Sequence, residues 1–437
     1  MSGVIYDKPH ETMPRRELEQ LQIERLQATL HRVYRNVSFY RSRYDEAGLD
    51  IDSVRSLEDL AKLPFSTKED LRRSYPYEAF AVPLRDIVRI HSTSGTTGKP
   101  IVVGYTRNDL KIWSSLVARV LAAAGVTSHD FVQVAFDYSL STGGFGFHGG
   151  AEEIGASVIP YSGEDVLRQI LVMKDYRTTV LVSTPGYALH VASLLEEAGR
   201  NAQELNLSIG LFGSEPWSEN LRKDIESRLK IEAFDNYGLS EIIGPGVAFE
   251  CSEHSGLHVN EDHFILEIVD PVTLEPVPAG SPGELVFTTV TKQGFPLIRY
   301  RTGDISALIE GDCACGRTTA RIERISGRTD DMVIVDGQNI FPSHIEEVLF
   351  GIEGVEPHFQ IVLTREEGMD RMELRVEVTP NFLAFDEIRR VQDFQETVAR
   401  HMASRLGIHA KITLVEPMSM KRPTGGKVER VLDRRNL

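Results

Sequence analysis

The spacing of apolar residues predicts helices in the first part of the chain. Helical spacing runs through residues 14–46, where the apolar positions are Leu18, Leu21, Ile23, Leu26, Leu30 and Val33. Residues 65–71 are typical of another helix start, because hydroxyl side chains that can cap it are followed by two acids in the first turn. We therefore expect a helical segment within residues 1–87.

Between about residues 88 and 245, runs typical of strands alternate with stretches typical of helices. The strand-like runs are 101–106, 131–136, 157–161, 180–183 and 209–212, and the helix-like stretches include 109–124, 165–176 and 219–229. This alternation predicts an α/β layer structure with a largely parallel sheet.

The remainder of the chain divides into two regions with different predicted secondary structure. Residues 255–325 are rich in strands, such as 264–269 and 283–289, separated by Pro and Gly. Residues 331–437 form a smaller α/β unit, with strands at 332–335, 360–364, 373–378 and 411–415 and helices near 342–350 and 384–406. The Gly327–Asp331 segment is the best candidate for a joint between the units.

Length and charge narrow the class of protein. A chain of 437 residues is too long for one ordinary core, so two or three domains are expected. The net charge of -16 argues against binding to nucleic acid or an anionic membrane, and no apolar run approaches the ~18 residues of a membrane span. Residues 1–16 lack the apolar core of a signal peptide, and 3 cysteines are too few for a disulfide framework. We therefore expect a cytoplasmic protein.

The Ser92–Pro100 segment gathers hydroxyl side chains, two glycines and one lysine. Hydroxyls and bare backbone N–H groups bind phosphate oxygens, and glycine lets the backbone approach them closely. A Walker loop is excluded, because Thr93 stands where that motif requires Gly and Pro100 follows Lys99. A polar turn between two strands is the alternative interpretation.

Three further motifs offer ligand chemistry. Asp235–Glu241 supplies an aromatic face, a hydroxyl and a carboxylate, which suit a purine, a phosphate and Mg²⁺, and Gly213–Pro216 follows a predicted strand, where ligands of open α/β sheets bind. Asp304 follows a glycine and can either hold both hydroxyls of a ribose or pair with Arg299 or Arg301. Pro423–Lys427, taken alone, is typical of a flexible basic tail.

In their order along the chain, these motifs resemble those of the adenylate-forming superfamily, which contains acyl- and aryl-CoA ligases, luciferases and the adenylation domains of peptide synthetases. Within it the chain looks most like the phenylacetate–CoA ligase group, from about Phe65 to Lys427. The resemblance implies a large multi-layer N-terminal α/β domain with an additional β-rich part (1–329), a hinge at Asp330 and a small mobile C-terminal α+β domain (331–437).

The resemblance also implies the reaction. ATP and an aryl carboxylic acid would form an acyl-adenylate and pyrophosphate with the help of Mg²⁺, and coenzyme A would then displace AMP. Phenylacetate leads as the acid, followed by indoleacetate and benzoate types. A non-catalytic nucleotide-binding relative is a further alternative, against which Lys427 and Glu241 argue. The oligomeric state stays open, and a homodimer is one candidate.

Individual roles follow from the resemblance, residue by residue. Lys427 would stabilise the adenylation transition state, Arg328 would lie near the nucleotide, and Lys68 would reach the adenylate phosphate. Ser240 would contact the α-phosphate, and Glu241 would ligate Mg²⁺. The remaining nucleotide contacts would be Asp304 for the ribose, Thr93, Ser94, Gly95, Thr96, Thr97, Gly98 and Lys99 for the β- and γ-phosphates, and Gly213, Ser214, Glu215, Pro216, Asn236, Tyr237 and Gly238 for adenine.

Two positions depart from the pattern expected of the group. Gly303 stands where an arginine is expected, and residues 336–339 differ from a basic Arg-Gly pattern. Because position 336 bears on the docking of coenzyme A, the coenzyme A contacts stay open.

Gly144–Gly149 matches Gly-x-Gly-x-x-Gly, follows a strand and opens a helix, and Glu164 lies near the place of a ribose-binding acid. An NAD-dependent oxidoreductase is therefore the rival enzyme class. Against it, the preceding strand ends near Phe136, whereas a true dinucleotide fingerprint starts at the strand end. In the ligase interpretation this glycine-rich loop lines the acid pocket, and ordinary core aromatics are the alternative. The residues expected in that pocket are Phe136, Tyr138, Phe145, Gly213 and Pro245.

The cysteines fall in two places. Cys251 is followed by His254 and His258, and Cys313 and Cys315 form a Cys-x-Cys pair. In a cytoplasmic protein this pattern indicates a structural zinc site with three Cys and one His, and the resemblance favours His258 over His254 as the fourth ligand. Three unrelated free thiols are the alternative.

Overall fold

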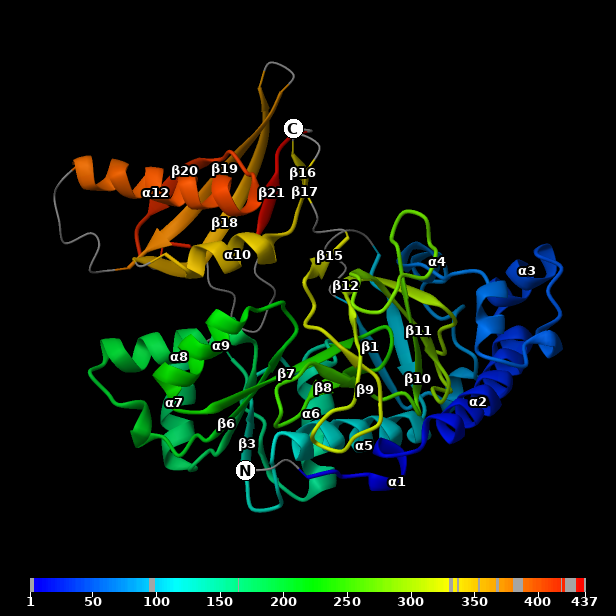
Figure 1. The fold of residues 1–437 in the computed structure, drawn as a ribbon. Helices are drawn as coiled ribbons and strands as arrows, with labels where there is room; N and C mark the ends of the chain where they lie inside the picture. The colour runs from blue at the N-terminus through cyan, green and yellow to red at the C-terminus, as the bar shows by residue number, and fades with distance from the viewer. Residues whose placement is uncertain are drawn as a thin grey trace.

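The structure is a computed structural model that describes residues 4–93, 99–163, 165–329, 333–335, 338–352, 354–366, 369–379, 388–417, 419–420 and 430–435. A large N-terminal part carries the helices and strands up to β15, and a smaller C-terminal part lies above it (Figure 1). The predicted mixed α/β class, with a large first unit and a small second one, is confirmed. Among the helices of these ranges, none has both the length and the apolar character that a bilayer crossing requires.

Helices begin the chain, as the apolar spacing predicts. They are α1 (Lys8–Glu11), α2 (Arg15–Asn36), α3 (Ser38–Glu46) and α4 (Lys68–Arg73). The stretch expected to be helical over 14–46 is divided because Val37 takes an extended conformation between α2 and α3. Thr67 caps α4 in a reciprocal capping box with Asp70, which fixes where this helix starts.

A nine-stranded sheet forms the centre of the N-terminal part. Its order is β13-β14-β9-β8-β7-β6-β5-β3-β4, and β4, β3, β5, β6 and β7 are parallel. The parallel strands are β3 (Phe131–Val134), β4 (Ser157–Ile159), β5 (Val180–Ser183), β6 (Ile209–Gly213) and β7 (Glu232–Leu239). The antiparallel strands are β8 (Gly244–Glu250), β9 (Leu257–Val259), β13 (Leu308–Ile309) and β14 (Arg321–Ile322). The helices of this part are α5 (Arg107–Ala123), α6 (Gly143–Ile154), α7 (Val166–Asp175), α8 (Pro185–Glu197) and α9 (Glu219–Leu229).

The strand after the phosphate segment lies outside this sheet. β2 (Val102–Tyr105) pairs antiparallel with β1 (Arg89–Ser92), and the two form a separate hairpin. The expectation that residues 101–106 belong to the α/β alternation is therefore wrong. The connection between the two strands is too short for the crossover that a parallel pair needs.

A second sheet follows in the order β10-β11-β12-β15. Its strands are β10 (Phe264–Val269), β11 (Gly283–Thr289), β12 (Tyr300–Ser306) and β15 (Gly327–Arg328). The pairing of β12 with β15 sets Asp304 opposite Arg328. Residues far apart along the chain thereby become neighbours in the site.

The C-terminal part has its own core. Its elements are β16 (Val333–Val335), β17 (Gln338–Ile340), α10 (Pro342–Phe350), β18 (Val355–Glu366), β19 (Met369–Val378), α12 (Ile388–Leu406), β20 (Lys411–Val415) and β21 (Val431–Asp433). The sheet order is β20-β19-β18-β21, and apolar side chains of both helices pack on its strands. At the joint, Phe341 lies against Gly327, where a built Cβ would be 2.5 Å from the ring.

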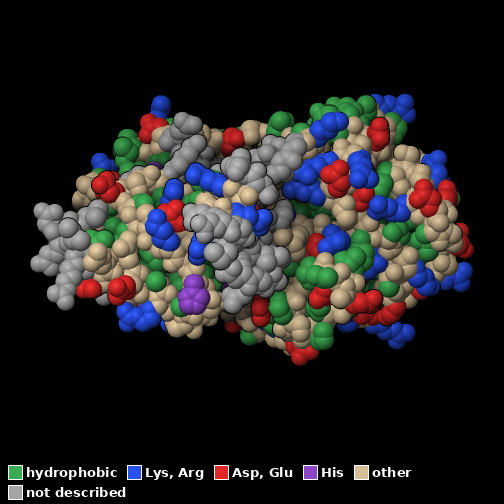
Figure 2. Space-filling model, turned by 90° about the horizontal axis from the view of Figure 1, so that it is seen from above, with side chains coloured by type: hydrophobic (Ala, Val, Ile, Leu, Met, Phe, Trp, Pro, Cys, Tyr) green, Lys and Arg blue, Asp and Glu red, His purple; other side chains and the backbone are tan. Residues whose placement is uncertain are grey.

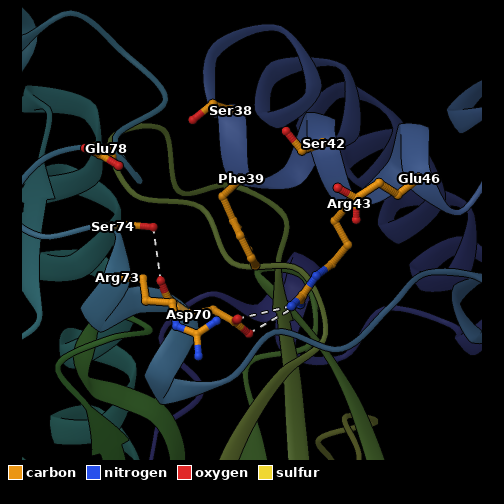
Figure 3. Close-up of a pocket in the computed structure, with 9 residues that line it drawn as sticks. All are labelled: Ser38, Phe39, Ser42, Arg43, Glu46, Asp70, Arg73, Ser74 and Glu78. Carbon is orange, nitrogen blue, oxygen red and sulfur yellow. Dashed lines mark hydrogen bonds and ion pairs between the residues drawn. The ribbon is translucent and has the colours of Figure 1, made fainter.

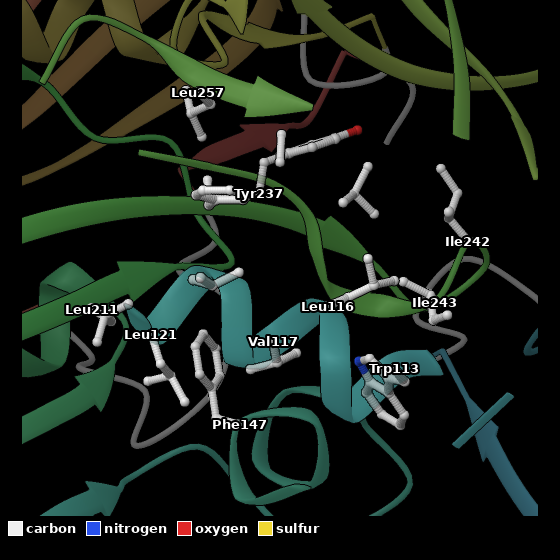
Figure 4. Close-up of a cluster of buried hydrophobic side chains, with 14 of the residues drawn as sticks. Trp113, Leu116, Val117, Leu121, Phe147, Leu211, Tyr237, Ile242, Ile243 and Leu257 are labelled. Atoms are coloured by element: carbon white, nitrogen blue, oxygen red, sulfur yellow. The ribbon is translucent and has the colours of Figure 1, made fainter. Parts of the chain in front are cut away.

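The main apolar core surrounds α5, which lies between the sheet and α6 (Figure 4). Close packing of α5 on α6 explains the glycines of the Gly144–Gly149 run, which the structure places in helix α6. A Cβ on Gly150 would lie 2.5 Å from Val117, and one on Gly146 would lie 2.7 Å from Trp113. The run opens helix α6, as the sequence indicates. The expectation that it forms a glycine-rich loop is wrong, because the glycines lie inside the helix and permit helix contact.

Ion pairs tie the N-terminal segment to later parts of the chain. Arg317 donates to Glu11 over 2.6 Å, and both side chains are buried. Arg15 makes a bidentate pair with Glu261. The start of the chain is therefore held by residues more than 240 positions away.

Candidate active site and metal centre

Asp304 and Arg328 meet where β12 and β15 run side by side. Arg328 Nη1 lies 2.5 Å from Asp304 Oδ1, and the Tyr237 hydroxyl donates to Asp304 Oδ2 over 2.6 Å. The alternative pairing of Asp304 with Arg299 or Arg301 is wrong, because these arginines pair with Glu267 and Glu284.

Tyr237 brings the end of β7 to this group. Its ring stacks on Phe287 at 6.1 Å, and burial together with the Asp304 charge raises the pKa of Tyr237 well above its ordinary value. Tyr237 is therefore a hydrogen-bond donor throughout the physiological pH range.

The turn that follows β7 carries Ser240 and Glu241. Ser240 Oγ lies 3.0 Å from the Thr142 hydroxyl at the start of α6. The buried Glu241 carboxylate receives one hydrogen bond from the described residues, a long one of 3.4 Å from the Tyr300 hydroxyl. Its oxygens therefore keep acceptor capacity for a hard cation such as Mg²⁺.

The Gly213–Pro216 loop leaves the neighbouring strand β6. Ser214 takes a left-handed conformation with φ 73, and Glu215 accepts a hydrogen bond of 2.9 Å from the Gly186 backbone N–H. Gly213 lies against Asn236, whose side-chain amide donates to the Phe212 carbonyl over 2.7 Å. Gly238 lies in the same strand as Asn236, so both segments expected to hold adenine end at one edge of the sheet.

The phosphate segment connects β1 to β2. Thr93 closes the β1–β2 hairpin by accepting the Ile101 N–H on its hydroxyl over 3.0 Å. Lys99 Nζ lies 5.6 Å from the centre of the Tyr75 ring. Lys68 is the first residue of α4, two positions after Ser66, which bridges to Tyr300 of β12.

Several predicted residues lie outside the described parts of the chain. They are Ser94, Gly95, Thr96, Thr97 and Gly98 of the phosphate segment, Glu164 of the oxidoreductase alternative, the hinge residue Asp330, residues 336 and 337, and Lys427.

The residues expected in the acid pocket do not all meet. The rings of Tyr138 and Phe145 contact each other edge-on at 5.2 Å. Pro245 also lies against α6, because a Cβ on Gly146 would be 2.5 Å from its ring. Phe136 instead stacks on Phe147 within the core, as the alternative of ordinary core aromatics proposes.

Two buried residues near these groups escaped the sequence analysis. Trp113 donates its indole N–H to the Pro245 carbonyl over 2.9 Å, next to the expected acid pocket. Lys292 is 1% exposed and donates to the Ile242 carbonyl over 2.6 Å, and burial lowers the pKa of Lys292 to about 7. Trp113 falls on the apolar face of a predicted helix, so its burial could have been predicted from the sequence. Nothing in the sequence distinguishes Lys292 from lysines at the surface.

The three cysteines and His258 come together in one cluster. Their ligand atoms all lie within 4.8 Å of one another. Cys251 Sγ lies 3.7 Å from Cys313 Sγ, and Cys315 Sγ lies 3.4 Å from His258 Nε2. Two sulfur ligands of a tetrahedral Zn²⁺, each about 2.3 Å from the ion, lie about 3.7 Å apart, so the spacing fits this metal.

The second ring nitrogen of His258 supports the same interpretation. His258 Nδ1 lies 3.2 Å from the Thr319 hydroxyl, which orients the ring as partners of metal-binding histidines do. His254 points elsewhere and contacts Glu250 at 3.3 Å and Glu232 at 3.2 Å. The contact between Cys251 and Cys315 lowers the pKa of Cys315 and raises that of Cys251.

The surface adds two observations. Seen from above, Lys and Arg side chains gather near the middle of the face where the two parts meet, although the chain is acidic overall (Figure 2).

An open polar depression of about 360 Å³ lies between α3 and α4, where Arg43 pairs with Asp70 at 3.1 Å (Figure 3). No residue predicted for the nucleotide or the acid lines this depression, so it is separate from the candidate active site.

Comparison with known families places the chain in a class. Residues 17–291 match the AMP-binding enzyme family, and residues 337–435 match the AMP-binding enzyme C-terminal domain. The chain therefore belongs to the AMP-binding enzyme family. The resemblance to the adenylate-forming superfamily is confirmed, and the oxidoreductase alternative is rejected.

Individual relatives are similar over almost their whole length. The chain is 46% identical to a phenylacetate-coenzyme A ligase of Thermus thermophilus, over 99% of this chain and 100% of the relative. It is 45% identical to a phenylacetate-coenzyme A ligase of Escherichia coli, over 98% of each chain.

Among solved structures, 2-hydroxyisobutyryl-CoA ligase is similar in fold and in sequence. In its postadenylation state with 2-HIB-AMP, the TM-score is 0.92 at 30% identity, covering 98% of this chain and 92% of that one. In the thioesterification state of the same enzyme, with 2-HIB-AMP and CoA, the TM-score is 0.71 at the same identity and coverage.

Proposed function

We propose that this protein is an AMP-forming ligase that joins phenylacetate to coenzyme A. The observation that carries the proposal is the 46% and 45% identity to phenylacetate-coenzyme A ligases over nearly complete chains. The group formed by Tyr237, Asp304 and Arg328, next to the Ser240–Glu241 turn, supports it with the polar groups that a nucleotide requires.

In the first half-reaction, a carboxylate oxygen of the acid attacks the α-phosphorus of ATP, and pyrophosphate leaves. No general base is required, because the acid is already ionised, so the task is positioning and charge neutralisation. Asp304 holds the ribose and Ser240 orients the α-phosphate. Glu241 would hold Mg²⁺, an ion whose charge would neutralise phosphate charge there. Thr93 and Lys99 contact the β- and γ-phosphates together with residues 94–98, and Lys427 stabilises the transition state.

The loop and strand ends around the sheet edge complete the nucleotide site. Gly213–Pro216 and Asn236–Gly238 enclose adenine, and Arg328 and Lys68 lie along the phosphates. The acid occupies the space between the Tyr138–Phe145 pair and Pro245, where Trp113 fixes the Pro245 carbonyl. Phe136 no longer belongs to this set, because it stacks on Phe147.

In the second half-reaction, the coenzyme A sulfur attacks the acyl carbon of the adenylate, and AMP leaves. We assign residues 1–329 to the body and residues 331–437 to a mobile domain that turns about Asp330. Support comes from the two TM-scores, 0.92 and 0.71, because they compare this chain with two states of one ligase at the same identity and coverage. Such hinges lie at the ends of elements.

The Cys251, His258, Cys313 and Cys315 cluster holds a structural Zn²⁺ in this proposal. With four protein ligands, no position is left for substrate, so the ion serves stability. The cluster ties the loop between β13 and β14 to strands β8 and β9.

The test is AMP release from ATP with phenylacetate, indoleacetate, benzoate and related acids, each with and without coenzyme A. We expect release that needs both acid and coenzyme A, and the highest kcat/KM with phenylacetate. A different best acid would correct the substrate, and acid-independent or absent release would contradict the ligase. Lys427→Ala should abolish adenylation but spare thioester formation from supplied phenylacetyl-adenylate.

A further inference from the structure

Lys292 lies beneath the turn that carries Ser240 and Glu241. The side chain is 1% exposed, and its ammonium donates to the carbonyls of Glu241 at 3.3 Å and Ile242 at 2.6 Å. Lysine is almost never fully buried without a partner, because an ammonium loses its hydration there. Its burial at this place therefore calls for an explanation beyond packing.

The next carbonyl of the turn is held in the same way. The Tyr105 hydroxyl donates to the Ile243 carbonyl over 3.0 Å, so side chains bind three consecutive carbonyls, at positions 241–243. On the inner side, the N–H groups of Ile242 and Ile243 both donate to the Leu239 carbonyl. Both edges of the turn are thus fixed, and Figure 4 shows Ile243 of this turn close to α5.

The backbone next to Lys292 is held by hydrogen bonds, as its ammonium is. Asp109 at the start of α5 accepts the backbone N–H of Gln293 at 2.6 Å and of Gly294 at 2.9 Å. Because these residues follow Lys292 directly, α5 determines where the lysine side chain begins. The ammonium reaches the turn from a fixed starting point.

The ammonium has aromatic faces around it and makes no ion pair with the described residues. Its Nζ lies 4.7 Å from the ring centre of Tyr105 and 5.4 Å from that of Phe295. No carboxylate of the described residues lies within salt-bridge distance of it. The hydrogen bonds of the Lys292 amine therefore go to the backbone carbonyls of Glu241 and Ile242.

We propose that Lys292 is a positioning residue for adenylation: it holds the Ser240–Ile243 turn in the conformation that presents the Ser240 hydroxyl and the Glu241 carboxylate to the nucleotide. This role rests on the proposed function, in which these two groups meet the α-phosphate and Mg²⁺. The lysine acts through the turn, because its hydrogen bonds go to backbone carbonyls and not to the reacting groups.

The test compares Lys292→Met, Tyr105→Phe and the surface control Lys174→Met. We expect Lys292→Met to accelerate amide hydrogen exchange in residues 240–244 and to raise the Mg²⁺ concentration for half-maximal adenylation by about tenfold, since hydrogen bonds to charged groups have that weight. Thioester formation from supplied adenylate should stay close to wild type, because it does not need the metal. Tyr105→Phe should change the same two quantities in the same direction, but less, and Lys174→Met should change neither.

Unchanged exchange at 240–244 together with an unchanged Mg²⁺ requirement would overturn the role, even if the melting temperature fell. If Lys292→Met does not fold, Tyr105→Phe decides in the same way, because it keeps the ring and removes only the hydroxyl. If the wild-type enzyme itself shows no acid-dependent adenylation, the proposed function fails. Hydrogen exchange then still tests whether Lys292 holds the turn.

Discussion

The Tyr237 hydroxyl donates to Asp304 over 2.6 Å and so joins the nine-stranded sheet to the four-stranded one. Tyr237 belongs to β7, and Asp304 belongs to β12. The bond orients the carboxylate that we assign to the ribose at the point where the two sheets meet. The candidate site therefore depends on the packing of one sheet against the other.

Tyr237→Phe should raise the KM for ATP by about tenfold and change kcat little. The substitution removes one hydrogen bond to a charged group but leaves the stacking on Phe287, and such bonds have about this weight in binding. Steady-state kinetics of AMP release, with ATP varied at saturating acid, measures the effect. Tyr34→Phe is the matched control, because Tyr34 makes a similar bond of 2.7 Å to Asp45 at the surface. Equal kinetics in the two variants would contradict the assignment of Asp304.

Cys313→Ser should weaken metal binding by at least about 100-fold, since changes even in the partners of metal ligands cost up to that much. The purified wild-type protein should contain about one zinc per chain by elemental analysis, and the variant far less, with a lower melting temperature. His254→Gln is the control, because His254 lies in the same region but outside the cluster, and it should retain the metal. A wild-type protein that never binds zinc would contradict the proposed site.

Asp235→Asn should remove a pH-dependent loss of stability. Burial, with a contribution from the Glu250 charge, raises the pKa of Asp235 to about 7. The folded state therefore keeps a proton that the unfolded state releases, and stability falls as the pH rises from about 4 to about 7. Thermal unfolding at about pH 5 and about pH 8.5 measures the effect. The free energy of unfolding of the variant, relative to wild type, should be roughly 1–4 kcal/mol higher at the higher pH than at the lower pH. A difference between variant and wild type that is independent of pH would contradict the raised pKa.

Gly150→Ala should destabilise the protein by about 1–3 kcal/mol, although alanine is the better helix former. The added methyl group would lie 2.5 Å from Val117 and push α6 away from α5. Gly163→Ala is the control, because a Cβ there has nothing within 4 Å. Thermal unfolding compares the two, and equal melting temperatures would show that the helices can separate without cost.

Local features of the fold were readable from the sequence because they depend on neighbours in the chain. Thr67 and Asp70 stand three positions apart and fix the start of α4. The apolar runs of the parallel strands were found for the same reason. The period of apolar residues does not show which strands pair with each other, however. For this reason β2 was expected in the large sheet, although it pairs with β1.

Parts of the site that depend on distant contacts could not be predicted. The pairing of Asp304 with Arg328 follows from the register of two strands, which no local pattern encodes. Lys292 gave no signal, because lysine is usually exposed and only the fold reveals its burial. The glycines near position 146 were misread as a loop, because their real role is to let α5 and α6 approach.

The ion pair between Glu11 and Arg317 has a consequence for biosynthesis. The two residues are separated by 306 positions, so Glu11 leaves the ribosome long before its partner exists. The parallel strands of the large sheet, in contrast, are complete once residue 239 has been made. Because domains begin to fold during synthesis, the central sheet can assemble while the first helices are still undocked. The apolar residues Leu26 and Leu30 of α2 pack in one cluster with Ile265, Val290 and Ile298. A nascent chain that stalls before residue 265 would therefore present this face of α2 to chaperones and proteases.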